Sequence, residues 1–300
     1  MNYYLGFDVG GTKCAAVVGD ESGVIHDRVT WASEAARGPG AMIEDLVDQG
    51  RMLLHRWEVR AAGVAIGGPL DSREGVIYSP PNLPGWDAVH LKQQLESAIG
   101  ISVVVEHDAA ACALAEYRWG AGAGAERLAY LTCGTGLGLG LVFDGNVYRG
   151  ASGNAPDFGH ISYRADGPLA YGKRGSLESF GAGSAIARLA NWRFPDRWAV
   201  GSIDGPGIAA LAAEGDRDAI EIIHLNADAV GDACALLGDT IYTDLIVLGS
   251  LARYLGESWL DRVKFQFNET AHPRVREICR IVPAGLGEKL QDCSSYVAAI

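Results

Sequence analysis

Two turns built from glycine and threonine constrain the fold most strongly, because each opens a similar series of strands and helices. Gly10-Gly11-Thr12 joins two apolar runs of strand length, and Gly134-Thr135-Gly136 joins two more in the second half of the chain. Apolar runs of this length, bounded by glycine turns, are typical of strand hairpins. The repeat predicts a duplicated α/β unit with a cleft between its halves.

The periodicity of the apolar residues locates the other elements. Met42, Leu46 and Leu53 recur at helical spacing, whereas the short continuous run Gly63–Ile66 is typical of a buried strand. The expected elements are strands at 3–9, 13–19, 24–31, 63–66, 103–105, 128–132, 137–143 and around 147, and helices at 40–57, 109–118 and 184–192.

A Gly-Ala-Gly-Ala-Gly run at 120–124 indicates a domain boundary and a hinge. We predict a small N-terminal α/β domain at 1–118 and a larger C-terminal α/β domain at 119–287. We expect the C-terminal helix, 288–300, to pack back on the N-terminal domain.

The net charge and the cysteine pattern exclude several classes of protein. With 25 Lys and Arg against 37 Asp and Glu, the formal net charge is -12, which argues against a nucleic-acid partner. The N-terminus lacks the basic start and apolar core of a signal peptide, and no apolar stretch is as long as a membrane span. Six cysteines without Cys-x-x-Cys spacing indicate reduced thiols. We therefore expect a cytoplasmic enzyme of small metabolites with no membrane partner.

The first glycine turn carries groups that suit a phosphate. Asp8 ends the preceding strand, and Gly10 and Gly11 let backbone N–H groups approach an anion closely. Thr12 and Lys13 add donors for phosphate oxygens. For this turn alone, an ordinary hairpin that needs glycine is an equally good explanation.

The second turn strengthens the phosphate interpretation. Glycines alternate through 134–140, and glycine inside a strand weakens it unless a ligand or another backbone comes close. Together the two turns favour phosphate binding, with Gly134, Thr135 and Gly136 as the second set of contacts. Neither turn has the Gly-x4-Gly-Lys-Ser/Thr pattern, and no strand precedes a complete Gly-x-Gly-x-x-Gly, so P-loop and Rossmann folds lose their usual support.

Asp108 is the candidate catalytic base. It follows the apolar strand at 103–105 and opens the alanine-rich helix at 109–118. An aspartate at a helix start often serves only as a cap, and the local pattern by itself favours that role. A carboxylate at a strand end can also accept the proton of a hydroxyl that attacks a phosphate. Both roles are compatible in one side chain.

Several separate blocks, in the right order and over nearly the whole chain, resemble the ROK group of bacterial sugar kinases, sugar-sensing repressors and uncharacterised relatives. The matching blocks are Asp8–Lys13, 67–69, 81–86, 106–116, 134–136, 150–160, Gly175 with Glu178, and 245–249. The resemblance implies a two-domain actin-like ATPase (ribonuclease H-like) fold, with ATP and Mg²⁺ between the domains and Asp108 as general base. It also suggests a homodimer. The repressors of this group normally carry an N-terminal DNA-binding domain, whereas here the first strand begins almost at Met1. A kinase is therefore favoured over a repressor.

The resemblance implies roles for particular residues. Those expected around ATP and its phosphates are Asp8, Gly10, Gly11, Thr12, Lys13, Gly134, Thr135, Gly136 and Gly249, with Mg²⁺ near Asp8 and Asp108. Those expected at the sugar are Gly68, Asn82, His107, Asp108, Asp157, His160 and Glu178.

The zinc motif of the family is lost in this sequence. Relatives bind zinc through a histidine at the position of His160 and three cysteines in Cys-x-Cys-Gly-x-x-Gly-Cys-x-Glu, but here 169–178 reads Leu-Ala-Tyr-Gly-Lys-Arg-Gly-Ser-Leu-Glu. One histidine cannot make a four-coordinate site, so no structural zinc is expected. We expect packing of Leu169 and Tyr171, with polar contacts, to hold the loop and to leave His160 for the sugar. The alternative interpretation, ranked second, is that His160 is a partly buried histidine hydrogen-bonded to backbone.

Two substitutions alter the expected sugar site. Asp157 replaces the family's glutamate and reaches less far, so it needs a bridging water or a shifted sugar. His107 replaces an asparagine and can titrate near neutrality. A site that hydrogen-bonds its substrate discriminates strongly, so the identity of the sugar does not transfer from the family. Glucose is the default, followed by N-acetylhexosamines and other hexoses.

The leading hypothesis is transfer of the ATP γ-phosphate to a hexose hydroxyl. The rival is a non-catalytic sugar-binding or sensor member of the same family, motivated by Asp157, His107 and the lost cysteines. Retention of both phosphate turns together with Asp108 counts against this rival. An acyl kinase or an actin-like filament protein would share the fold but would not explain the block at 150–160.

Overall fold

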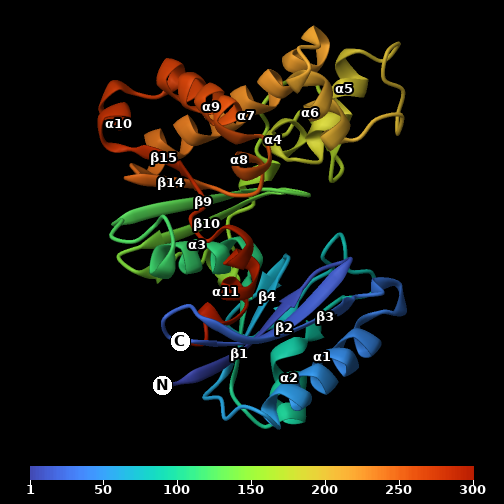
Figure 1. Ribbon diagram of the computed structural model, residues 1–300, viewed down its shortest axis with the longest axis vertical. Helices are drawn as coiled ribbons and strands as arrows, with labels where there is room; N and C mark the ends of the chain where they lie inside the picture. Colours follow the sequence, from blue (N-terminus) through green and yellow to red (C-terminus); the bar gives the residue numbers. More distant parts are fainter. The chain divides into compact units, whose positions relative to one another are not determined.

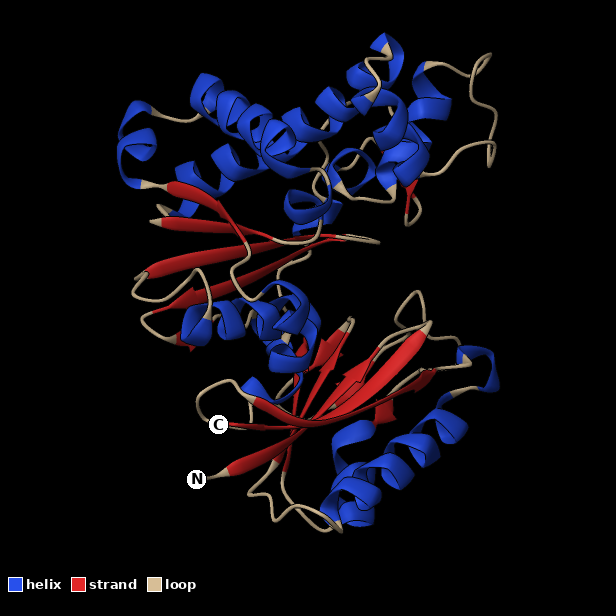
Figure 2. Ribbon diagram, viewed as in Figure 1, coloured by secondary structure: helices blue, strands red, loops and turns tan.

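The computed structural model describes residues 1–300, except for the side chain of Ser152. The chain forms two compact units (Figures 1 and 2). The first comprises 1–123, 140–156 and 286–300, and the second comprises 124–139 and 157–285.

The first unit is built on a five-stranded mixed sheet. Its strands, in spatial order, are β3 (Ile25–Ala32), β2 (Lys13–Asp20), β1 (Tyr3–Val9), β4 (Ala62–Ile66) and β8 (Val103–His107). Strands β1, β2 and β3 are antiparallel, whereas β1, β4 and β8 run parallel. The carboxyl ends of the parallel strands therefore lie at one edge, which is where ligands bind in open α/β sheets.

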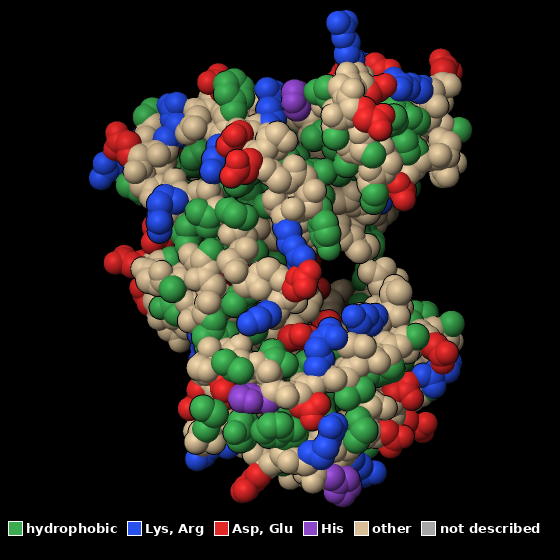
Figure 3. Space-filling view, in the orientation of Figure 1, with side chains coloured by type: hydrophobic (Ala, Val, Ile, Leu, Met, Phe, Trp, Pro, Cys, Tyr) green, Lys and Arg blue, Asp and Glu red, His purple; other side chains and the backbone are tan. Residues whose placement is uncertain are grey.

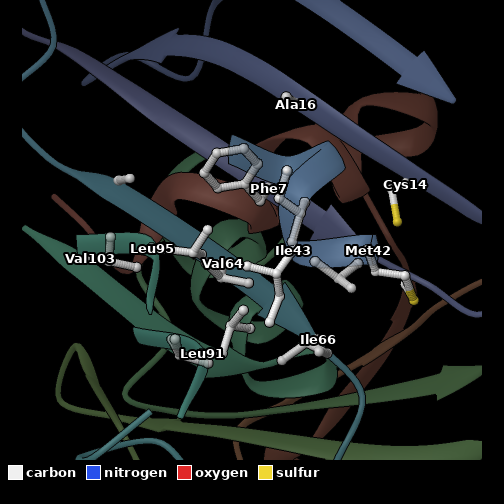
Figure 4. Packing of buried hydrophobic residues seen from close by; sticks show 14 of the residues in the cluster. Phe7, Cys14, Ala16, Met42, Ile43, Val64, Ile66, Leu91, Leu95 and Val103 are labelled. Atoms are coloured by element: carbon white, nitrogen blue, oxygen red, sulfur yellow. The ribbon is translucent and has the colours of Figure 1, made fainter. Parts of the chain in front are cut away.

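Helices cover both faces of this sheet. Helices α1 (Pro39–Leu54) and α2 (Leu91–Ile99) pack on one face, and α11 (Leu290–Val297) contacts β1, β4 and α3 (Asp108–Trp119) (Figure 1). Burial on both faces explains why β1 and β4 are almost continuously apolar. Figure 4 shows Phe7, Ile43 and Val64 meeting in the core between the sheet and α1.

Helix α11 approaches the sheet closely. A Cβ on Gly63 would lie 2.5 Å from the carbonyl oxygen of Ser295, and one on Gly6 would lie 2.1 Å from the Ser295 hydroxyl. Glycine inside a strand normally weakens it, and here it makes room for the helix. The last segment of the chain thus packs on the first strand.

The second sheet repeats this plan. Its strands, in spatial order, are β11 (Asn146–Val147), β10 (Leu137–Phe143), β9 (Arg127–Cys133), β14 (Leu245–Leu248) and β15 (Arg280–Pro283). Strands β9, β14 and β15 are parallel. The helices after β11 are α4 (Leu177–Gly181), α5 (Ala185–Arg193), α6 (Gly205–Ala213), α7 (Arg217–Ile241), α8 (Leu251–Tyr254), α9 (Gly256–Thr270) and α10 (Pro273–Ile278). Helix α7 is the centre of this group and packs against α4, α5, α6 and α9.

The remaining elements are short. They are strands β5 (Leu70–Asp71), β6 (Val76–Ile77), β7 (Val89–His90), β12 (Leu169–Ala170) and β13 (Lys173–Arg174), and four 3-10 turns, η1 (Ala35–Arg37), η2 (Ala151–Gly153), η3 (Phe158–His160) and η4 (Gly287–Lys289). Acidic and basic side chains are interspersed over the face in Figure 3. In the part of the chain that the structure describes, no helix combines the length and the apolarity needed to span a bilayer.

The predicted α/β plan with two glycine-turn hairpins is confirmed, with one shortened helix. The helix expected at 40–57 ends at Leu54. Trp57 lies outside it because its ring packs edge-on against Tyr3, with the centroids 5.0 Å apart, and its Nε1 donates to Asp27. This tertiary contact outweighs the helical periodicity.

Candidate active site

The first glycine turn is held by backbone. The N–H of Gly10 donates to the carbonyl of Lys13 at 3.2 Å, which closes the turn between β1 and β2. A Cβ on Gly11 would lie 2.5 Å from the carbonyl oxygen of Asn82, so only glycine fits there without a shift of backbone. The structure thus brings Asn82 beside this turn, and the side chains of Thr12 and Lys13 are exposed.

Two carboxylates of the first unit interact electrostatically. Asp8 lies at the end of β1, next to β4 in the parallel register. Burial, and then repulsion from Asp108, raise the pKa of Asp8 to about 7, although Lys13 and Arg28 oppose the shift. A divalent cation would relieve this repulsion, so the pair suits Mg²⁺ with its preference for oxygen ligands.

Asp108 is the first residue of α3 and its side chain is 52% exposed. Its Oδ1 accepts the N–H of Ala109 at 2.6 Å and lies 3.2 Å from Nδ1 of His107. The structure records no hydrogen bond to Oδ2 of this described side chain, which points toward Gly67 at 4.0 Å from the position of a Cβ there. One oxygen therefore caps the helix, and the other is open to a ligand.

His107 is the N-cap of α3 and accepts the N–H of Ala109 at Nδ1, 3.3 Å away. A Cβ on Gly68 would lie 2.8 Å from Cδ2 of the imidazole, so glycine at 68 leaves room for the ring. Gly68, His107 and Asp108 are thus adjacent.

An ion pair between the buried Glu106 and the exposed Arg149 was missed by the sequence analysis. Glu106 is 1% exposed, and Oε2 accepts hydrogen bonds from Nε and Nη2 of Arg149. Burial raises the pKa of Glu106 even though Arg149 opposes the shift. The pair ties the end of β8 to the loop after β11. Sequence offered one signal, a glutamate two residues before the candidate base in an otherwise apolar strand.

The loop at 150–156 is anchored to the first unit. Oδ1 of Asn154 accepts the N–H of Leu70 at 3.1 Å, and the hydroxyl of Ser72 donates to the carbonyl of Gly153 at 2.7 Å. The matching block at 150–160 is therefore divided, because Asp157 and His160 belong to the second unit.

The second glycine turn is held by a side chain. Its Gly134 N–H donates to the carbonyl of Gly136 at 3.1 Å. Oε2 of Glu178 accepts the N–H of Leu137 at 3.0 Å and would lie 2.8 Å from a Cβ on Gly136. Glu178, which the resemblance placed at the sugar, thus also supports this turn.

His160 and Glu178 are neighbours in the second unit. Cβ of Glu178 lies 3.2 Å from the position of a Cβ on Gly159, and the η3 turn that contains His160 contacts α4. Burial raises the pKa of Glu178, although the Leu137 N–H, Arg188 and His160 oppose the shift. His160 and Asp157 are exposed, so the alternative of a partly buried histidine is wrong.

Gly249 follows β14 and lies beside the second turn. Its N–H donates to the carbonyl of Leu131 at 2.8 Å, and a Cβ there would lie 2.4 Å from the Tyr130 hydroxyl. The next residue, Ser250, has its hydroxyl 3.5 Å from the position of a Cβ on Gly134. The end of β14 and the second glycine turn therefore share one region of the second unit.

Comparison with known proteins identifies the family. The model described as the ROK family matches residues 4–290. The chain belongs to the ROK family. A glucokinase of Streptomyces coelicolor is 30% identical over 305 residues, which cover 96% of this chain and 95% of that protein.

Solved ROK structures agree with the fold. A ROK hexokinase from Thermus thermophilus superposes with a TM-score of 0.86 at 31% identity, covering 98% of this chain and 97% of that one. A ROK glucokinase from Streptomyces griseus in complex with glucose and AMPPNP has a TM-score of 0.83 at 29% identity, and 98% of each chain is covered. These findings confirm the predicted fold and support a sugar kinase.

The loop at 169–178, which we expected to be held by packing and polar contacts, is held only in part as predicted. Leu169 and Tyr171 are 54% and 48% exposed, so the expectation that their packing holds the loop is wrong. Instead the hydroxyl of Tyr163 donates to Asp232 at 2.6 Å, and the guanidinium of Arg164 lies 5.3 Å from the ring centroid of Phe180. Polar and aromatic contacts of Tyr163 and Arg164, just before the loop, thus contribute more than the packing of its apolar side chains.

The metal sites of this ROK protein stay predictions. Among the described residues, no three His, Cys, Asp or Glu side chains cluster in a way that could hold a metal ion. Mg²⁺ commonly binds through one or two carboxylates together with phosphate oxygens and waters, and Asp8 with Asp108 provides such a pair.

Proposed function

We propose that this protein transfers the γ-phosphate of ATP to a hydroxyl of a hexose, with Asp108 as the general base. Membership of the ROK family and the named kinase relatives support sugar phosphorylation. The observation that supports the role of Asp108 is that its two carboxylate oxygens have different surroundings. Oδ1 is occupied by the Ala109 N–H, while Oδ2 is available to a substrate hydroxyl.

Asp108 acts by orienting and deprotonating the sugar hydroxyl. The cap on Oδ1 fixes the carboxylate plane, because the N–H of Ala109 belongs to the first turn of a helix. The free oxygen then accepts the hydroxyl proton as the oxygen–phosphorus bond forms and the bond to the leaving ADP breaks. After transfer, the proton leaves the carboxyl group to water.

The two glycine turns are proposed to bind the phosphates of ATP. In the first, Gly10 and Gly11 allow close approach, and the exposed Thr12 and Lys13 donate to phosphate oxygens. In the second, the N–H groups of Thr135 and Gly136 have no hydrogen-bond partner among the described residues and can donate to an anion. Asp8 and Asp108 are the carboxylates suited to Mg²⁺, which when bound neutralises phosphate charge. Gly249 is proposed to border the adenosine.

The acceptor is proposed to be glucose or a related hexose or N-acetylhexosamine. Gly68, Asn82 and His107 of the first unit and Asp157, His160 and Glu178 of the second are the proposed sugar contacts. The exposed Asp157 has no recorded hydrogen bond from its side chain and is free to bind a hydroxyl, directly or through water.

The test is ADP release with ATP and Mg²⁺ against a panel of hexoses and N-acetylhexosamines. We expect turnover on at least one sugar, and we expect Asp108→Asn to lower kcat by about 10²- to 10⁴-fold, the usual contribution of a general base. Asp218→Asn is the matched control, because Asp218 is also in the first turn of a helix and pairs with Arg197. It should change kcat less than twofold.

The outcomes separate the two hypotheses. Turnover that survives Asp108→Asn would contradict the assigned base. Sugar binding by calorimetry without turnover on any sugar would support the sensor alternative. We also propose a cytoplasmic homodimer, as the family resemblance suggests, and light scattering would test the dimer.

A further inference from the structure

The start of helix α5 is bonded to the second phosphate turn. The N–H of Ser184 donates to the carbonyl of Gly134 at 3.2 Å, and its hydroxyl donates to the carbonyl of Thr135. A Cβ on Gly183 would lie 3.0 Å from the carbonyl of Gly134, so the helix start and the turn are in close contact. One serine thus binds two successive carbonyls of the turn.

Arg188, one helical turn further on, holds that serine. Nη2 of Arg188 donates to the Ser184 hydroxyl at 3.0 Å. Nε of the same guanidinium is buried without a hydrogen-bond partner among the described residues. Leaving a buried donor unpaired costs free energy that an apolar side chain of similar length would avoid. The charge of Arg188 must therefore serve some purpose at this position.

Glu178 and Arg188 place opposite charges beside the same turn. The carboxylate of Glu178 accepts the N–H of Leu137 on one side of the turn, and Arg188 acts on it electrostatically. Ser184 binds the carbonyls of Gly134 and Thr135 on another side. With these groups bound to protein, the N–H groups of Thr135 and Gly136 stay unpaired among the described residues.

We propose that Ser184 and Arg188 are positioning residues for nucleotide binding, which hold the second turn in the conformation that presents its N–H groups to the phosphates of ATP. The serine fixes the two carbonyls, and the arginine orients the serine hydroxyl and offsets the negative charge of Glu178. Preorganised donors bind an anion more strongly because no ordering is needed when the ligand arrives. The inference rests on the proposed function.

The test measures nucleotide and sugar binding separately. We expect Ser184→Ala to raise KM for ATP and the Kd of AMP-PNP with Mg²⁺ by about tenfold, the loss of one or two hydrogen bonds. The Kd for glucose, measured by calorimetry without nucleotide, should stay within twofold. Ser184→Thr keeps the hydroxyl and should restore KM for ATP. Arg188→Met should act like Ser184→Ala.

Arg193→Met is the matched control, because Arg193 lies on the same helix and pairs with Glu221 away from the turn. It should leave both constants unchanged. The proposal is overturned if Ser184→Ala and Arg188→Met match Arg193→Met in KM for ATP, or if ATP and glucose binding weaken equally. Should Arg188→Met fail to fold, Ser184→Ala at an unchanged melting temperature decides the question. If the wild type has no turnover at all, the proposed function fails, whereas AMP-PNP binding still tests the turn.

Discussion

The turn at Gly10–Lys13 and the turn at Gly134–Gly136 have similar sequences but different neighbours. The first packs on a backbone carbonyl, that of Asn82, and lies near two carboxylates that repel each other, Asp8 and Asp108. The second packs on the end of a flexible side chain, Glu178, whose charge is offset by Arg188 and a backbone N–H. A backbone neighbour cannot move without moving the chain, whereas a carboxylate can rotate. The first turn should therefore tolerate change less well than the second.

The largest effect is expected from Gly11→Ala. Its Cβ would lie 2.5 Å from the Asn82 carbonyl, so the turn or the proposed sugar residue must shift. We expect kcat/KM to fall by more than about 100-fold and stability to fall by about 1–3 kcal/mol, as measured by steady-state kinetics and urea unfolding. Gly40→Ala is the control, because no atom lies within 4 Å of its Cβ position. Activity close to that of the wild type in Gly11→Ala would contradict the comparison.

The pH dependence of stability should differ between the two turns. The raised pKa of Asp8, about 7, means that its stabilising contribution is present below the unfolded value of 3.8 and is lost as the pH rises through 7. Asp8→Asn should thus be more stable than the wild type at pH 8, by at most about 4 kcal/mol before solvent screening, while losing kinase activity.

Urea unfolding at pH 5 and pH 8, without nucleotide or Mg²⁺, measures this effect. Glu178→Gln is the comparison at the second turn, where the Leu137 N–H, Arg188 and His160 oppose the rise in pKa. Its gain in stability at pH 8 should be the smaller one. An equal gain in stability at pH 8 in both variants would contradict the proposed electrostatic difference between the two turns.

A smaller effect is expected from Gly136→Ala. The new Cβ would meet Oε2 of Glu178 at 2.8 Å, and the carboxylate can rotate away at the cost of its bond to the Leu137 N–H. We expect about a tenfold rise in KM for ATP, the value of roughly one hydrogen bond, measured by the same kinetics. A loss of kcat/KM as large as that in Gly11→Ala would show that a side-chain neighbour restricts an added Cβ as much as a backbone neighbour does.

The smallest effect is expected from Tyr163→Phe, in the segment that precedes helix α4 and Glu178. Removal of the hydrogen bond to Asp232 should lower the free energy of unfolding by about 1 kcal/mol and change KM for sugar less than threefold. Melting curves with and without EDTA are the measurement. We expect no shift with EDTA in either protein, since the family's cysteines are absent, and a large shift would reveal a structural metal.

Local sequence predicted both turns, most sheet strands and helices α1, α3 and α5, because strand and helix periodicity depends on neighbouring residues. It did not predict helices α2, α6, α7, α9 and α10. It placed β1, β2 and β10 within one residue of their observed bounds. Trp57 was placed in a helix because the local apolar periodicity gives no information about its contact with the distant Tyr3. Leu169 and Tyr171 were expected to pack because they are apolar, yet 54% and 48% of their surfaces stay exposed.

The sequence by itself determined the α/β pattern, the two glycine turns, the position of Asp108 at a helix start and the resemblance to the ROK family. The support of the second turn by Glu178 and Ser184 and the pairing of Glu106 with Arg149 were decided only by the tertiary structure. The physical reason is the separation along the chain between the residues that interact. Turns and periodicity follow from adjacent residues, whereas these contacts join residues more than 40 positions apart that meet only when the sheets and helices pack.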